Sequence, residues 1–299
     1  MPPLEFPFAE APARGELKEV SPGILWLRMP LPYRLDHINL YLMRHEDGWV
    51  VIDTGINSDE TKTLWEQIFA QLPANEPIKA VLCTHSHNDH IGCAGWLTEK
   101  FRVPLYMSMG DYFSLRALEG GFDPNAWEMV RFYRQLGFTE ERVQSMFAKF
   151  ANMRFTSAVP KSYNRLRDDR EITLGGKQWR IIVSEGHAPE HVSLFCEESR
   201  ILICGDQLLP RISANVGVNA IEPEANPLKL WLESLDRVGQ LPADTLVLPA
   251  HELPYYGLDT RAKQLREHHQ HQLDELVQIC RDHPGSPLQL MEHMYPRRK

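Results

Sequence analysis

Residues 84–90 read Thr-His-Ser-His-Asn-Asp-His and follow directly after a short apolar run. Such a passage restricts the fold, because a strand that passes at once into a tight loop can point alternate side chains at one place. Imidazole nitrogens and carboxylate oxygens are ligands that suit zinc and similar divalent ions. His85 and His87, two residues apart, would face one ion, while Asp89 and His90 would face a second. The run therefore predicts two metal ions.

Four apolar runs of the sequence each lead to a histidine or an aspartate. They are residues 81–83 before His85, residues 181–183 before His187, residues 201–203 before Asp206 and residues 246–248 before His251. Strands of a sheet that end on the same edge bring such side chains together even when they are far apart in the sequence. We therefore expect these four residues to converge on one site.

The remaining pattern mixes short strands with amphipathic helices. The first 55 residues predict a strand meander with three strands, and Ser58 is placed to cap a helix that runs to about residue 72. The expected strands are residues 23–28, 38–42, 49–53, 78–82, 171–174, 178–183, 191–196, 200–204 and 245–248. Two further helices are expected at residues 227–238 and 259–281.

One segment interrupts this alternation with a helical pattern rich in aromatic residues. We predict a principal domain over residues 1–257 that carries a helical insert at about residues 110–165, followed by a C-terminal helical extension over residues 258–299. The insert is either a lid or substrate wall over the site, or a satellite helical pair with its own small core. Both interpretations remain open, and they are compatible.

The predicted C-terminal helix carries three histidines on different faces. His269 falls on the apolar stripe of this helix, whereas His268 and His271 lie off the stripe. A polar side chain on a buried stripe is unusual, and packing against the principal domain is the role that we expect for it.

On these motifs the sequence resembles the metallo-β-lactamase fold superfamily, and within it the hydrolase branch related to glyoxalase II and β-lactamase-like protein 2. The resemblance covers about residues 20–253 and implies an α/β fold, a four-layer αβ/βα sandwich. Its five ordered motifs are Asp53-Thr54-Gly55, the run at residues 85–90, Gly-His-Ala-Pro-Glu-His at residues 186–191, Gly205-Asp206 and Pro249-Ala250-His251.

The same resemblance implies a complete set of ligands for two metal ions. The first ion would be held by His85, His87 and His187, the second by Asp89, His90 and His251, and both would be bridged by the carboxylate of Asp206. We expect zinc in both positions, with iron or manganese as the alternatives.

Three further residues are candidates around the ligands. By the resemblance, Asp53 would lie behind the histidines, where its carboxylate would fix their orientation and tautomer. Glu190 stands where many relatives have glycine and adds a carboxylate near the metals. Either Glu190 or His191 is a candidate for contact with substrate, and a salt bridge or ordinary packing is the alternative for both.

Charge and composition limit the partners of the chain. With 32 Lys and Arg against 40 Asp and Glu, the formal net charge is −8, which opposes non-specific binding to a phosphate backbone. Neither a run long enough to cross a membrane nor a secretory pattern at the start is visible. We expect a cytoplasmic protein that acts on a small molecule. Nucleic acid is a less favoured partner, and a homodimer remains open.

These expectations combine into a metal-dependent hydrolase of a small ester, thioester or lactone. Two divalent ions about 3.5–4 Å apart lower the pKa of a bridging water and polarise the bond under attack. Asp89 or Asp206 would orient the resulting hydroxide or carry its proton. The alternatives are a metal-dependent nuclease or phosphodiesterase, an oxidoreductase similar to the mononuclear iron persulfide dioxygenases, and a binding module without catalysis.

Overall fold

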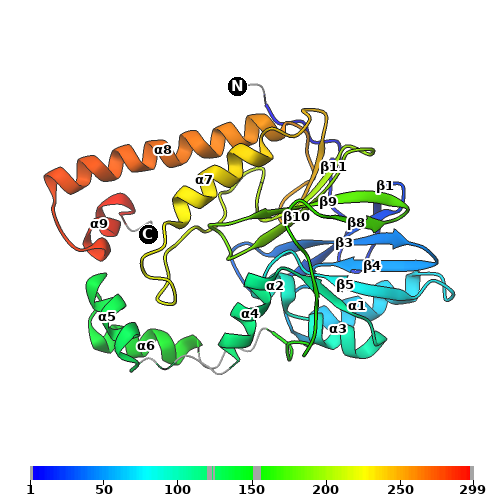
Figure 1. Ribbon diagram of the computed structural model, residues 1–299, viewed down its shortest axis with the longest axis horizontal. Coiled ribbons are helices and arrows are strands. Elements are labelled where there is room, and N and C mark those ends of the chain that lie inside the picture. The colour runs from blue at the N-terminus through cyan, green and yellow to red at the C-terminus, as the bar shows by residue number, and fades with distance from the viewer. Residues whose placement is uncertain (1–2, 120–122, 124, 151–155, 297–299) are drawn as a thin grey trace.

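Two β-sheets face each other in this computed structural model, and helices cover the outer face of each sheet (Figure 1). The structure describes residues 3–119, 123, 125–150 and 156–296. The order of layers is helices, sheet, sheet, helices, so the predicted α/β sandwich of four layers is confirmed. Parts of the predicted insert and the last three residues of the predicted extension lie outside the described residues.

The first sheet has seven strands in the order of the sequence. Its strands are β1 (Lys18–Ser21), β2 (Ile24–Pro30), β3 (His37–His45), β4 (Gly48–Ile52), β5 (Ile78–Leu82), β6 (Leu105–Met107) and β7 (Asn164–Arg165). Strands β2 to β4 are the three-strand antiparallel meander that the sequence predicts, β1 is an additional strand that pairs antiparallel with β2, and β5 to β7 continue the sheet in parallel.

The second sheet has five strands in the order β12-β11-β10-β9-β8. They are β8 (Glu171–Leu174), β9 (Lys177–Ser184), β10 (His191–Cys196), β11 (Ile201–Gly205) and β12 (Leu246–Pro249). Neighbours from β8 to β11 are antiparallel, whereas β12 lies parallel to β11 because α7 forms the crossover between them.

The helices lie between the strands in the sequence or follow the last strand. They are α1 (Asp59–Gln71), α2 (Asn88–Ile91), α3 (Ala94–Phe101), α4 (Met109–Leu118), α5 (Trp127–Gln135), α6 (Glu140–Phe150), α7 (Pro227–Val238), α8 (Leu258–Asp282) and α9 (Pro287–Met294). Ser58 caps α1 as predicted, since its hydroxyl accepts a hydrogen bond from the Thr61 N–H at 3.1 Å.

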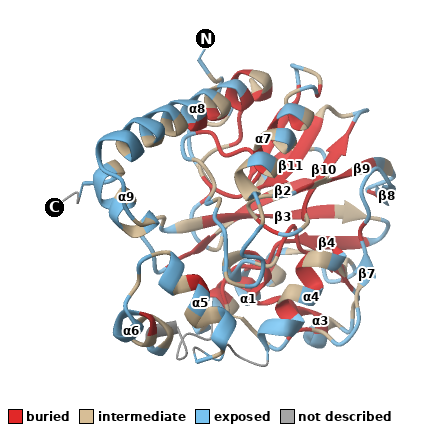
Figure 2. Cartoon of the chain, turned by 60° about the vertical axis from the view of Figure 1, so that its left-hand side comes forward, coloured by how far each residue is buried: buried red, intermediate tan, exposed pale blue. Residues whose placement is uncertain are grey.

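The alternation of side chains along each strand builds three layers of core, and Figure 2 shows buried residues along the strands of both sheets. In β3, Leu40 and Leu42 face α1 and α3, where Trp65 is fully buried, while Tyr41 and Met43 face the second sheet. A third cluster around Trp231 joins the second sheet to α7 and α8. The two-residue period of the strands therefore fixes which side chains meet between the sheets.

A helical rim, defined as α4–α6 together with α9, borders the sandwich (Figure 1): α4 packs on the first sheet through Tyr112 and Leu115, whereas α5, α6 and α9 stand beside it. Helices α5 and α6 share a small core in which Phe132 and Val143 are buried. The Leu288 N–H of α9 donates to the Leu136 carbonyl at the end of α5, at 3.0 Å. Helix α5 is thus tied to α9, which lies in the predicted C-terminal extension, while the boundaries of the predicted domains remain a prediction.

None of the described helices is both long and apolar enough to cross a membrane.

Candidate metal centre

The four residues expected at strand ends do converge, but they come from both sheets rather than from one. His85 follows β5 of the first sheet, whereas His187, Asp206 and His251 follow β9, β11 and β12 of the second. The expectation of a single sheet edge is therefore wrong. Because the two sheets face each other, the ends of their strands lie side by side, and the loops beyond them share one site.

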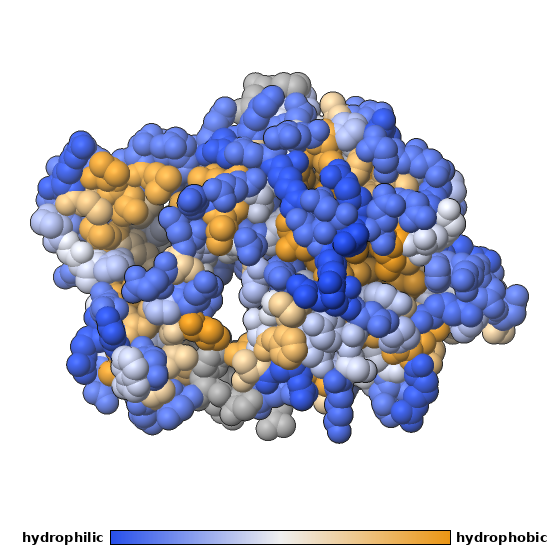
Figure 3. All heavy atoms as spheres, in the orientation of Figure 1, coloured by the Kyte–Doolittle hydropathy of each residue, from blue (hydrophilic) through white to orange (hydrophobic). Residues whose placement is uncertain are grey.

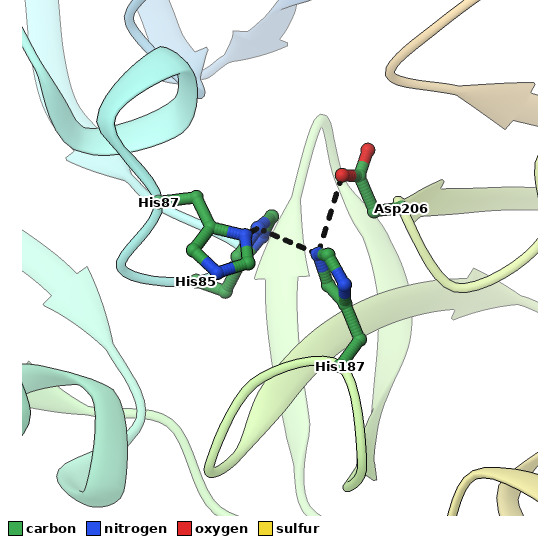
Figure 4. Close-up of side chains that lie close together, drawn as sticks. All are labelled: His85, His87, His187 and Asp206. Carbon is green, nitrogen blue, oxygen red and sulfur yellow. Dashed lines mark hydrogen bonds and ion pairs between the residues drawn. The ribbon is translucent and has the colours of Figure 1, made fainter. Parts of the chain in front are cut away.

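A first cluster contains three imidazoles and one carboxylate (Figure 4). His85 Nε2 lies 2.9 Å from His87 Nδ1 and 3.2 Å from His187 Nε2, and His187 Nε2 lies 3.3 Å from Asp206 Oδ2. The donor atoms of the four residues all lie within 4.8 Å of one another. Three ring nitrogens are therefore aimed at a common point.

The charge state of these imidazoles suits a cation. Burial, reinforced by the neighbouring imidazoles, holds the pKa of His85 well below its ordinary value. Burial and the nearby His187 also lower the pKa of His87 to about 4. Both rings are uncharged at neutral pH, so their lone pairs are available to a metal ion.

A second cluster lies next to the first and contains Asp89, His90 and His251. Asp89 Oδ2 lies 3.5 Å from His251 Nε2 and 3.7 Å from His90 Nε2. Asp206 Oδ1 lies 3.5 Å from His90 Nε2 and 3.3 Å from His251 Nε2. Since Oδ2 of Asp206 faces the first cluster, one carboxylate presents one oxygen to each.

Two buried polar atoms test whether this donor set fits metal ions. His90 Nε2 and Asp206 Oδ1 are buried and have no hydrogen-bond partner among the described residues. An unsatisfied buried polar atom costs about 1–3 kcal/mol, so native proteins rarely leave one in place without a reason. Both atoms face the second cluster, where a divalent cation would satisfy them. The residues present fit two such ions.

Asp53 lies directly behind the second cluster. Its Oδ2 lies 2.8 Å from His90 Nδ1, and its two oxygens also accept hydrogen bonds from the Thr84 N–H at 2.7 Å and the Thr84 hydroxyl at 2.8 Å. Burial alone would lower the pKa of His90, but the carboxylates of Asp53, Asp89 and Asp206 outweigh it and raise that pKa. A carboxylate on Nδ1 leaves Nε2 as the free donor atom of the ring.

Backbone carbonyls orient two other histidines in the same way. His187 Nδ1 lies 2.8 Å from the Asn215 carbonyl, and His251 Nδ1 lies 2.8 Å from the His37 carbonyl. Each Nδ1–H donates to its carbonyl, which turns Nε2 towards the site. Neither carbonyl could be predicted from the sequence, because every residue carries one.

Sequence reasoning missed the side chains that fix the His251 loop to the first sheet. Asn39 of β3 is buried, and its Nδ2 donates to the carbonyls of Pro249 at 2.9 Å and Glu252 at 2.8 Å. The Tyr41 hydroxyl donates to the Pro249 carbonyl at 2.9 Å. An asparagine in the otherwise apolar strand at residues 38–42 was the available signal.

Asp111 of α4 is a second omission. Its Oδ1 accepts the Ser86 N–H, between two of the candidate ligands, and its Oδ2 accepts the Glu190 N–H, both at 2.8 Å. Burial raises the pKa of this carboxyl, and the two N–H groups and the Ser108 hydroxyl partly oppose that change. The spacing Ser108-x-x-Asp111 indicates a helix start, but it says nothing about the loops that Asp111 joins.

Glu190 and His191, the two candidates for contact with substrate, differ in their contacts and burial. The Glu190 carboxylate accepts the Gly110 N–H at 2.7 Å and lies 3.9 Å from Arg165, so the salt-bridge interpretation describes its contacts. His191 is 0 % exposed, and its Nε2 accepts the Asp206 N–H at 3.1 Å. This burial argues against the predicted contact of His191 with substrate and makes the residue a support for Asp206.

Comparison with known proteins identifies the class to which this fold and site belong. The sequence profile of the Metallo-beta-lactamase superfamily matches residues 33–251, and the chain belongs to that superfamily. The predicted resemblance is confirmed, and so is the assignment to the metallo-hydrolases. Solved and curated relatives extend the likeness beyond the matched region.

A crystal structure of a beta-lactamase domain protein from Burkholderia ambifaria is 41 % identical, covers 98 % of this chain and 88 % of its own, and superimposes with a TM-score of 0.87. The probable metallo-hydrolase YqjP of Bacillus subtilis is 24 % identical over 287 residues, which are 91 % of this chain and 85 % of that protein. A hydroxyacylglutathione hydrolase of Francisella tularensis is 26 % identical over 221 residues, or 73 % of this chain and 64 % of the relative.

Proposed function

We propose that this protein hydrolyses a small ester, thioester or lactone at a centre of two divalent metal ions, with zinc as the expected metal. The observation that carries the proposal is the convergence of seven histidine and aspartate residues in two adjacent clusters, linked by the two oxygens of Asp206. His90 Nε2 and Asp206 Oδ1 add support, because they are buried and have no hydrogen-bond partner among the described residues.

Bound divalent ions would supply an activated water at neutral pH and would polarise the carbonyl under attack. The protein holds the two clusters at a fixed spacing through Asp206, whose backbone N–H is bound by His191. The side chain of Asp89 is 19 % exposed against 10 % for Asp206, so Asp89 is the carboxylate better placed to exchange a proton with solvent. We assign the Asp89 carboxylate to accepting the proton of the attacking water.

Two observations favour an acyl substrate. The name of the Francisella tularensis relative describes hydrolysis of an acylated glutathione. The helical rim also carries exposed apolar side chains, among them Phe113 and Trp127. Figure 3 shows a hollow in this face of the molecule. In Figure 1 the same place is bordered by α4, by the segment before α7, and by α5 and α6. An apolar acyl or leaving group would be bound there.

The competing functions have less support. A nuclease would need cationic side chains to bind phosphates, whereas the chain carries a net charge of −8. A mononuclear iron oxidoreductase would need only the first cluster. Asp89, His90 and His251 would then be grouped with no metal ion to bind. The second cluster therefore favours the dinuclear hydrolase.

The test combines metal analysis with substrate profiling. Protein purified without added metal is analysed for zinc, iron and manganese, and the same sample is assayed with thioesters, esters, lactones and a phosphodiester. His87→Ala should abolish turnover, whereas His271→Ala, which removes an exposed histidine of α8, should not change it. Undiminished turnover by folded His87→Ala protein would refute the proposal. Cleavage of the phosphodiester alone would move the function to the nuclease class.

A further inference from the structure

The C-terminal helix α8 lies outside the matched superfamily region, yet it is bonded to the segment that leaves the metal centre. This segment, residues 206–216, begins at Asp206 and passes along α8 before it enters the loop that leads to α7. We infer that Arg261 and His269 of α8 are positioning residues that fix the orientation of His187 through this segment. The inference rests on the proposed metal centre.

The first half of the contact is made by Arg261. Its Nε donates to the Leu209 carbonyl at 2.6 Å and its Nη2 to the Ile212 carbonyl at 2.9 Å. Arg261 is only 9 % exposed, so these carbonyls replace water as partners of a buried guanidinium. The Tyr255 hydroxyl, just before α8, donates to the Leu208 carbonyl at 2.9 Å. Three carbonyls of the segment, those of Leu208, Leu209 and Ile212, are thereby held.

The second half of the contact is made by His269, the histidine on the apolar stripe. It is 9 % exposed, and its Nε2 lies 3.1 Å from the Ser213 hydroxyl. Two residues further on, the Asn215 carbonyl accepts the hydrogen bond from His187 Nδ1 at 2.8 Å. Ala214 and Val216, on either side of Asn215, pack against the core cluster shared by α7 and α8. The carbonyl that orients His187 is thus placed by α8.

The effect should be confined to the first cluster. His187 belongs to that cluster, whereas His90 and His251 of the second are oriented by Asp53 and by the His37 carbonyl. Among the described contacts, none of these supports is bonded to α8. Asp206 contributes to both clusters, but its own N–H is held by His191. Release of the Asn215 carbonyl should therefore weaken one metal site and spare the other.

The experiment measures the binding of Zn²⁺ and Co²⁺ to the full chain, with His87→Ala and His251→Ala identifying the signals of the first and second sites. His269→Leu keeps the apolar stripe but removes the hydrogen bond, and Ser213→Ala removes its partner. Each should lower the affinity of the first site by about 10- to 100-fold, as is typical when the group that orients a ligand is lost. His269→Gln, which retains a donor near Nε2, should restore most of that affinity.

Matched controls come from the same helix. Arg266 also donates to a backbone carbonyl, that of Leu232 at 2.9 Å, but this carbonyl belongs to α7. Arg266→Met should leave both metal affinities within about twofold of the original, while Arg261→Met should behave like His269→Leu. If Arg261→Met does not fold, the His269 and Ser213 variants still decide the question. His268→Leu, at an exposed position, is the control for His269.

Unchanged first-site affinity in folded His269→Leu and Ser213→Ala would overturn the inference. Equal weakening of both sites would overturn it as well, since that result indicates general destabilisation rather than positioning of His187. Failure of the proposed function would look different: the original protein itself would bind neither metal at the two clusters.

Discussion

The floor of the metal centre and the helical rim beside it are built in opposite ways. The floor consists of Asp53, Thr84 and His90. These residues are at most 3 % exposed and are hydrogen-bonded to one another. On the rim, Phe113 is 57 % and Trp127 is 66 % exposed. The floor fixes the chemistry because several hydrogen bonds hold its side chains in one geometry. The exposed side chains of the rim can differ without disturbing that geometry, so we expect the rim to govern which substrate fits.

The largest effect should follow a change at the residue that links the two clusters. Asp206→Asn replaces an oxygen donor with an amide N–H, which cannot bind a metal ion. Because metal ions supply several kcal/mol of transition-state stabilisation, turnover should fall about a thousandfold or more. The measurement is kcat together with the metal content of the folded variant.

Asp168→Asn is the matched control, since this carboxylate pairs with Arg237 on the surface. It should retain full activity and both metals. Retention of two metals and of kcat by Asp206→Asn would show that the carboxylate does not bridge the clusters.

The next largest effect should come from Asp53, which contacts the candidate ligand His90 but is not itself a candidate ligand. Asp53 accepts three hydrogen bonds, from the Thr84 N–H, the Thr84 hydroxyl and His90 Nδ1. Asp53→Asn offers one oxygen where the aspartate offers two, so at least one donor loses its partner and His90 is held less firmly. Affinity for the second metal should fall about 10- to 100-fold, measured by competition with a chelator. An unchanged affinity would mean that the Thr84 contacts alone orient the loop.

The same contrast explains what could be predicted from the sequence. His85, His87, Asp89 and His90 lie within one short run, so their chemistry is visible locally, and the apolar runs before His187, Asp206 and His251 place these residues at strand ends. The supports were not visible, because they depend on contacts between segments that are far apart in the sequence. The carbonyls of Asn215 and His37 carry no signal in their residue type, and Asp111 joins two loops that only the folded chain brings together.

The rim was predicted only in outline. The sequence indicates helices and aromatic residues at about residues 110–165, but not the contact between α5 and α9. Helix α9 was missed, although Ser286 and Gln289 form a capping box and Pro287 occupies the first turn. Two features of the contact between α5 and α9 are the hydrogen bond from the Leu288 N–H to the Leu136 carbonyl and the close approach of Gly137 to Ser286, and neither belongs to a recognisable motif.

Gly137 allows a test of whether the rim is coupled to the floor. It has a φ of 93°, and a Cβ at this position would collide with Ser286 at the start of α9. Gly137→Ala should destabilise the contact between α5 and α9 by about 1–2 kcal/mol from backbone strain alone. Hydrogen exchange should rise at residues 127–136 and 286–294 while the metal content stays constant.

Gly176→Ala separates the backbone strain of an alanine at positive φ from the collision with Ser286. Gly176 has a φ of 73°, but no atom of the described residues outside its own turn lies within 4 Å of the place that a Cβ would occupy. The substitution should reproduce the strain without loosening the rim. A loss of bound metal in Gly137→Ala would contradict the division between floor and rim.

The smallest effect should come from an exposed apolar side chain of the rim. Phe113 lies on α4 two residues after Asp111, and its exposed ring contacts Tyr112 and Tyr163. Phe113→Ala removes apolar surface that a substrate would cover, worth about 1 kcal/mol, so KM should rise roughly fivefold with kcat and metal content unchanged. Phe113→Leu should recover most of the loss. A fall in kcat with constant KM would instead place Phe113 in contact with the transition state, and the rim would then take part in the chemistry as well as in the choice of substrate.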